Sequence, residues 1–222
     1  MTMSLRRSAG YRATALLAFA AGIALGALPA IADQQRRDVA EFHEVGVAGQ
    51  AEVDIQVGPA RSVVLEADAA DLPHLKAEVK DGELHIGYER AWFGAKGEHG
   101  PYKAHITTPR LDGFGLAGAG TARITGMDAK KAELKIAGSG EITASGKAEA
   151  LAVEIAGSGS VRVAELAARE AEVKIAGSGD AEVKASHELA VNIAGSGSVA
   201  HVGQPANGVK THITGSGRVS QR

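Results

Sequence analysis

A five-residue motif recurs along the second half of the chain and constrains its fold more than any other feature. The letters IAGSG stand at 136–140, 155–159, 175–179 and 193–197, and the variants LAGAG and ITGSG stand at 116–120 and 213–217. Successive copies begin 18 to 20 residues apart. A near-constant period of this length is typical of a solenoid, in which each repeat forms one coil and packs against its neighbours.

Apolar residues alternate with polar ones on both sides of each glycine pair. Ala171, Val173 and Ile175 precede one copy in this pattern, and Ala181 and Val183 follow it. A period of two indicates strands with one buried face. A helix is disfavoured because each interior glycine would cost about 1 kcal/mol relative to alanine. The pattern predicts an all-β fold with two strands per repeat and with the glycines at the bends.

Stacked coils would place equivalent residues about 4.8 Å apart in ladders along the axis. Lys135, Glu154 and Lys174 would form a ladder of alternating charge, which favours this register. Arg162 would lie over Glu182 in the same way. One further ladder would carry hydroxyl groups, from Ser139, Ser158, Ser178, Ser196 and Ser216.

The N-terminal segment has the features of an export signal. A basic start is followed by an apolar run at 13–28 and by Ala30-Ile31-Ala32, which suits cleavage before Asp33. A retained membrane anchor is the alternative, but the run is short for a span of about 20 residues. We therefore expect a signal peptide at 1–32, a periplasmic or secreted mature chain at 33–222, and no transmembrane span in the mature chain.

The region before the repeats is less regular. Val47-Ala48-Gly49 and the alternating residues 51–55 resemble a repeat and predict an early coil. Strands are expected at about 61–67, 75–79, 84–88 and 103–107, with a hairpin turn at Asp81-Gly82 and a helical turn at 68–72. We treat 33–222 as one domain, with an irregular part at 33–113 and the G-S-G coils at 114–222.

Several of these segments together resemble a known family. FHEVGVAG at 42–49, DGELHI at 81–86, ITTPRL at 106–111 and the serial GSG coils are similar to the head GIN domain family of auto-transporter adhesins. The resemblance covers essentially all of 33–222. It implies a single-chain, right-handed β-solenoid exported to the bacterial envelope, in a family without an established biochemical function.

The glycine pairs do not match the motifs that bind cofactors. A dinucleotide fingerprint needs a third glycine, a phosphate loop needs Gly-Lys-Ser/Thr, and a hydrolase elbow needs G-x-S-x-G; none of these patterns occurs at the repeats. A calcium β-roll needs an aspartate in every turn, and only Asp180 stands at that position. We expect no cofactor and interpret the glycines as corners.

Other chemistry is weakly indicated. The histidines are scattered, so no metal site is expected. The chain carries a formal charge of −2, which disfavours nucleic acid as a partner. A polysaccharide lyase or glycosidase on a β-solenoid remains the alternative function, since stacking could bring carboxylates together.

One glycine-rich segment gathers four aromatic residues: Tyr88, Trp92, Phe93 and Tyr102. Aromatic residues on loops often contact ligands, which makes these four the candidate binding residues. The alternative is a cap in which Trp92 and Phe93 cover the solenoid core. We expect a non-enzymatic binding or structural module of the envelope, with a glycan or a protein as partner. Arg218 and Arg222 would oppose end-to-end stacking, so a homodimer would form through another face.

Overall fold

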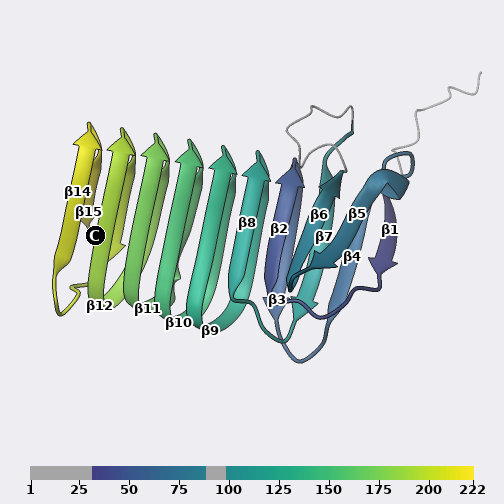
Figure 1. The fold of residues 1–222 in the computed structure, drawn as a ribbon, viewed down its shortest axis with the longest axis horizontal. Coiled ribbons are helices and arrows are strands. Elements are labelled where there is room, and N and C mark those ends of the chain that lie inside the picture. The colour runs from purple at the N-terminus through teal and green to yellow at the C-terminus, as the bar shows by residue number, and fades with distance from the viewer. Residues whose placement is uncertain (1–31, 89–98) are drawn as a thin grey trace, which may run out of the picture. The chain divides into compact units, whose positions relative to one another are not determined.

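The computed structural model describes residues 32–88 and 99–222, and in these residues the chain is almost entirely strand. All strands belong to one continuous sheet that winds into a β-solenoid, as the sequence predicts (Figure 1). The coils follow one another as a right-handed spiral. The repeat region contains β8 (Gly113–Gly118), β9 (Thr121–Gly138), β10 (Glu141–Gly157), β11 (Ser160–Gly177), β12 (Asp180–Gly195), β13 (Ser198–Val202), β14 (Val209–Gly215) and β15 (Arg218–Gln221).

Each long strand spans a whole coil, from one G-x-G corner to the next. The expectation of two separate strands per repeat is therefore wrong in detail, because the backbone stays extended through two bends. In β9 the buried–exposed alternation is interrupted at 125–126 and at 130–131, where neighbouring residues are both exposed. These interruptions and the G-x-G corner divide a coil into three straight segments around a narrow core.

The coils differ in their number of residues, and the extra residues lie away from the segment that leads into the G-S-G corner. Equivalent residues of that segment therefore stay in register. Residues 150–157 of β10 pair one to one with 170–177 of β11, up to Gly157 opposite Gly177. The register shifts lie at the other two bends: between Thr143 and Ser145 and between Val163 and Ala167 at the first bend after the corner, and between Ala168 and Glu170 at the second. The segment that leads into each G-S-G corner is thus the constant part of the coil.

Two further coils precede the repeats in space. They comprise β2 (Glu44–Gly49) with β3 (Ala51–Val57), and β6 (Glu83–Tyr88) with β7 (Tyr102–Thr108). Gly49 pairs with Gly118 and β3 pairs in parallel with β9, which confirms the early coil. The β6–β7 coil stacks on the outer side of β2–β3, so the chain crosses back over one coil to begin β8.

Antiparallel strands close the N-terminal end. They are β1 (Ala32–Arg37), β4 (Ser62–Asp68) and β5 (Leu75–Lys80), with a 3₁₀ turn η1 (Leu72–His74) between β4 and β5. The predicted strands agree with β4 to β7, and the helical turn lies a few residues later than predicted. The Asp81-Gly82 hairpin is confirmed, with φ of 53° and 85°. Leu65, Leu72 and Leu75 are buried in this cap.

The core consists of stacked aliphatic side chains. Leu134, Val153 and Val173 lie at the same position of successive coils and are fully buried. The pattern changes in the last coil, where the equivalent of Val191 is Thr211 and Ile213 is 38% exposed. In the described residues the N-terminal end is thus capped by apolar side chains, whereas the last coil presents a partly polar edge.

The two glycines of each corner are required for different reasons. Gly177 has φ of +132°, and a Cβ there would lie 2.3 Å from the carbonyl oxygen of Gly157 in the coil below. A Cβ on Gly179 would lie 2.6 Å from Cγ2 of Ile155. The first glycine therefore permits a left-handed turn and close backbone stacking, and the second leaves room for a core isoleucine.

Replacement of a corner glycine should destabilise the protein far more than replacement of a glycine in a strand. We expect Gly177→Ala to lower the free energy of unfolding by about 1–3 kcal/mol or more, because it combines a strained φ with a backbone clash. Gly115→Ala is the matched control, since a Cβ there meets nothing within 4 Å. Urea unfolding followed by circular dichroism measures both variants. Equal midpoints would contradict this account of the corners.

Candidate binding face

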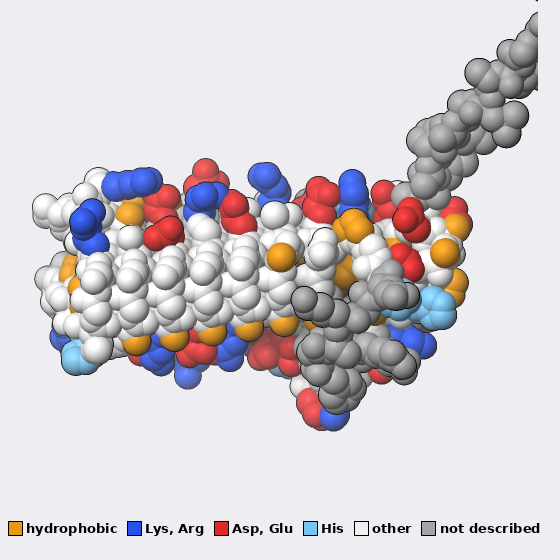
Figure 2. Space-filling view, turned by 90° about the horizontal axis from the view of Figure 1, so that it is seen from above, with side chains coloured by type: hydrophobic (Ala, Val, Ile, Leu, Met, Phe, Trp, Pro, Cys, Tyr) orange, Lys and Arg blue, Asp and Glu red, His pale blue; other side chains and the backbone are white. Residues whose placement is uncertain are grey.

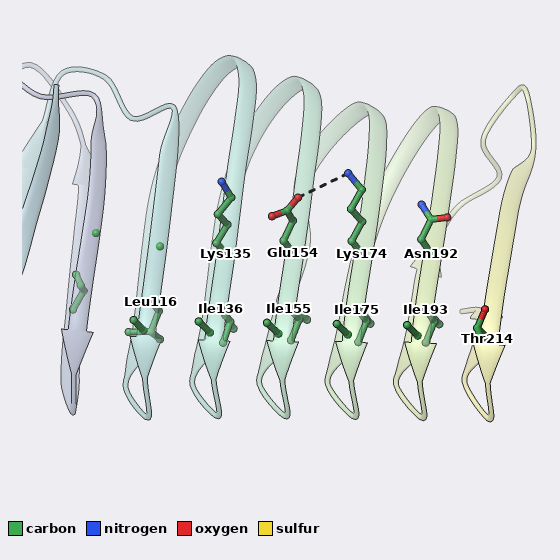
Figure 3. Close-up of a pocket in the computed structure, with 18 of the residues that line it drawn as sticks. Leu116, Lys135, Ile136, Glu154, Ile155, Lys174, Ile175, Asn192, Ile193 and Thr214 are labelled. Carbon is green, nitrogen blue, oxygen red and sulfur yellow. Dashed lines mark ion pairs between the residues drawn. The ribbon is translucent and has the colours of Figure 1, made fainter. Parts of the chain in front are cut away.

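A shallow groove runs along the solenoid on one of its three sides. It has a volume of about 760 Å³ and extends from Gly46 of β2 to Thr214 of β14. Its lining comes from the segment that leads into each G-S-G corner, which is the constant part of the coil (Figure 3). We call the outward side of these segments in β8, β9, β10, β11, β12 and β14 the front face; it faces the viewer in Figure 1.

The groove has an apolar floor and a polar rim. The floor is a column of exposed small side chains, which are Ala117, Ala137, Ala156, Ala176, Ala194 and Thr214. The rim is the neighbouring outward column of Gly115, Lys135, Glu154, Lys174, Asn192 and His212. Both columns are continuous because the register is unbroken here. The alanine column follows from the second letter of the motif, a signal that the interpretation of the sequence did not use.

The rim carries the predicted ladder of alternating charge. Glu154 pairs with both Lys135 and Lys174 in the strand register, which confirms the prediction. The ammonium of Lys174 lies 3.8 Å from Glu154 and 3.0 Å from Glu172, its neighbour on the same strand. The hydrogen bond to Glu172 raises the pKa of Lys174, and the hydrogen bond to Glu133 raises the pKa of Lys135. These pairs are exposed and contribute little to stability.

A second charged column lies on the segment that follows the corner. Arg162 and Glu182 are register partners, as predicted. The ion pair, however, joins Arg162 to Glu141, whereas Glu182 accepts a hydrogen bond from Arg222 at 3.0 Å. Long side chains reach diagonally, so a shared register does not fix which charges meet.

The G-S-G corners form an uncharged band between the two charged columns, as Figure 2 shows. Each serine N–H donates to a glycine carbonyl of the preceding coil, as Ser178 does to Gly157 at 2.9 Å. The serine side chains of four successive corners, Ser139, Ser158, Ser178 and Ser196, are exposed. The predicted hydroxyl ladder is therefore on the surface, next to the alanine column.

The four aromatic candidate residues divide into two groups. Tyr88 and Tyr102 end β6 and begin β7, and they are 6% and 2% exposed. The Tyr102 hydroxyl donates to two backbone carbonyl oxygens, that of Ala48 at 2.9 Å and that of Ile86 at 3.2 Å. Trp92 and Phe93 lie outside the described residues.

A cluster around His99 joins the residues just before β7 to the N-terminal cap. Asp71 accepts hydrogen bonds from Nδ1 of His99 at 2.9 Å and from the N–H of Gly100 at 2.8 Å. These bonds lower the pKa of Asp71, the one from His99 most. The His99 ring stacks on Tyr88 with centroids 4.3 Å apart. No sequence pattern indicated this cluster, because its members meet only through the fold.

Two other kinds of feature are absent from the described part of the chain. Within 32–88 and 99–222, no three His, Asp or Glu side chains gather in a way that could hold a metal ion. No helix among the described residues is long and apolar enough to cross a membrane. The geometry instead defines a β-solenoid with one extended, repetitive face.

The family follows from the sequence. Residues 41–205 match the family described as "Putative auto-transporter adhesin, head GIN domain". The chain belongs to this family, as the resemblance of its motifs predicts. No curated protein sequence matches it.

Solved structures share the fold at low sequence identity. A putative adhesin from Bacteroides fragilis has a TM-score of 0.66 and 18% identity, over 86% of this chain and 97% of that one. A putative lipid binding protein from Parabacteroides distasonis has a TM-score of 0.56 and 22% identity, over 86% and 96%. A putative adhesin from the same organism has a TM-score of 0.55 and 20% identity, over 86% and 97%.

The buried tyrosines predict an alkaline loss of stability. Burial raises the pKa of Tyr88 from 10.0 to about 12 and raises that of Tyr102 further. The neutral phenols are favoured in the folded state, so their contribution is complete below pH 10 and is lost as the pH rises through about 12. We expect Tyr88→Phe to reduce this loss, because phenylalanine has no hydroxyl that can ionise. The substitution removes no hydrogen bond within the described residues, since the buried hydroxyl of Tyr88 has no partner there. Unfolding midpoints from pH 8 to 12 measure it; identical pH profiles for the variant and the parent would contradict the assignment.

Proposed function

We propose that this chain is an exported, non-enzymatic binding module of the bacterial cell envelope and that the front face is its binding surface. The observation that carries the proposal is the groove itself. Its floor of small side chains and its outward rim run over six neighbouring strands, β8, β9, β10, β11, β12 and β14; only Thr214 departs from alanine in the floor, and only Gly115 departs from a polar residue in the rim. A periodic surface suits a periodic or extended partner, since each coil offers the same contacts again.

Membership of an adhesin family supports a binding role. The acidic side chains also support a binding role, because most of those near the groove form ion pairs with lysine side chains. Glu188 is 2.7 Å from Lys210, and Glu172 is 3.0 Å from Lys174. A glycosidase needs a pair of carboxyl groups that face each other across a sugar-binding cleft. The exposed ion pairs of this face suit recognition better than acid–base catalysis.

The front face can be tested with two alanines from the same strand. Ala176 lies on the groove floor, and Ala167 is exposed on another side of the same coil. We expect Ala176→Tyr to reduce binding to isolated cell envelopes by about tenfold, because a large side chain fills the groove, and Ala167→Tyr to leave binding unchanged. Co-sedimentation of the purified protein with envelope fractions measures both.

The choice of binding probe can show which class of partner the protein binds, and it can distinguish a binding module from a carbohydrate-active enzyme. Envelope polysaccharide and phospholipid vesicles serve as separate probes, the latter because a structural neighbour is named a putative lipid binding protein. Equal loss of binding in both variants would place the binding surface elsewhere, with the segment from Tyr88 to Tyr102 as the next candidate. Release of reducing ends from polysaccharide by the purified protein would favour the carbohydrate-active enzyme instead.

Export is a separate part of the proposal. The basic start, the apolar run at 13–28 and Ala30-Ile31-Ala32 support a signal peptide that is cleaved before Asp33. We expect the full chain, expressed in a bacterium, to be recovered outside the cytoplasm with a mass that corresponds to residues 33–222. Fractionation followed by intact-mass measurement tests this. A cytoplasmic protein of full length would contradict it.

A further inference from the structure

We propose that the front face binds a second copy of this chain, face to face and with the two solenoid axes antiparallel. This inference rests on the proposed function, because it names a partner for the same face. It follows from the order of residues in the outward columns, which the register fixes along six strands. These strands run side by side with little twist in Figure 1, so two such faces can lie flat on each other.

The relevant symmetry is a two-fold axis that lies between the faces and runs parallel to the strands. Such an axis places each column on the same column of the partner, in reverse order. An axis midway between the strands of Glu154 and Lys174 overlaps all six strands. In the rim column it pairs Glu154 with the partner's Lys174, Lys135 with the partner's Asn192, and Gly115 with the partner's His212.

The neighbouring outward columns fit the same axis. The column two residues earlier pairs Ala152 with the partner's Glu172, Glu133 with the partner's Ala190, and Gly113 with the partner's Lys210. At the edge of the face, Lys131 meets the partner's Glu188 and Ala150 meets the partner's Glu170. Each long side chain of these columns faces either an opposite charge or a smaller uncharged residue.

The alanine floor is also compatible with this arrangement. The axis pairs Ala156 with the partner's Ala176, Ala137 with the partner's Ala194, and Ala117 with the partner's Thr214. Facing rows of methyl groups bury apolar surface without steric conflict. Because these side chains are shorter than those of the rim, the two sheets would incline toward each other along the alanine columns.

Other positions of the axis are less favourable. An axis through the strand of Glu154 would oppose Glu154 to the partner's Glu154 and Lys135 to the partner's Lys174, and like charges across an interface are strongly disfavoured. Axes between other pairs of strands cover at most four of the six strands of the front face. The axis between the strands of Glu154 and Lys174 is therefore the one that covers all six strands, and the order of charges is compatible with it.

The size of the face is adequate for a specific dimer. Six strands at about 4.8 Å and seven residues at about 3.3 Å give a flat area of roughly 650 Å². The accessible surface of a face with protruding side chains exceeds its flat area, and a standard interface buries about 800 Å² per partner. The cap and the β2–β3 and β6–β7 coils lie outside the overlap.

Charge exchange at the centre of the interface tests the inference. Residue 154 faces the partner's Lys174 across the axis, so Glu154→Lys would bring two ammonium groups together. Lys174→Glu would bring two carboxylates together at the same place. We expect each single variant to raise the dimer dissociation constant by about tenfold or more, and the double variant to restore it. A mixture of the two single variants should form heterodimers, because their charges are complementary. Sedimentation velocity measures all four samples, with Glu141→Lys as a control on another side of the coil.

The outcomes separate this inference from the proposed function. Circular dichroism first confirms that each variant is folded, and heterodimers in the mixture show that both single variants are competent. A parent protein that stays monomeric at its highest soluble concentration would overturn the inference. So would a dimer that Glu154→Lys does not weaken, because its interface would lie elsewhere. Binding to envelope fractions that depends on Ala176, in a strictly monomeric protein, would leave the proposed function intact while the dimer is rejected.

Discussion

The close stacking of backbone at the G-S-G corner is the constraint on which the rest of the structure depends. At this corner the first glycine of each coil lies directly over that of the preceding coil, too close for any side chain. The serine N–H then donates to the preceding glycine carbonyl, which fixes the vertical spacing. These contacts do not allow one coil to shift along its neighbour at the corner. Differences in coil length therefore appear only at the other two bends.

The unbroken register has a functional consequence, because it turns a sequence pattern into columns on the surface. The side chain three residues before the first corner glycine always lies beside its equivalents in the neighbouring coils, and the same holds for the residue immediately before that glycine. The rim and the floor of the groove therefore follow directly from the motif and the letter that precedes it. A solenoid with looser corners would not align outward side chains over six strands, and the groove would not be continuous.

Much of this could be predicted from the sequence, since the decisive interactions repeat at short range. The coils, the early coil at Val47–Gly49 and the hairpin at Asp81-Gly82 follow from local patterns and are confirmed. The cap could not be predicted in the same way, because β4 and β5 pair with β7 and β6 in antiparallel order without a repeat to mark it. The ion pair between Arg162 and Glu141 could not be predicted either, because the strand register does not determine which neighbouring carboxylate a long arginine side chain contacts.

The irregular β6–β7 coil is held by individual side-chain contacts, whereas the regular coils are held by their register. In the β6–β7 coil, the Tyr102 hydroxyl donates to the carbonyl oxygen of Ala48, and His99 contacts Asp71 of the cap. Neither Tyr88 nor Tyr102 has an exposed side chain, so both rings belong to the core of this coil. The irregular coils thus depend on contacts that occur once, whereas the regular coils repeat theirs and form a flat face (Figure 1).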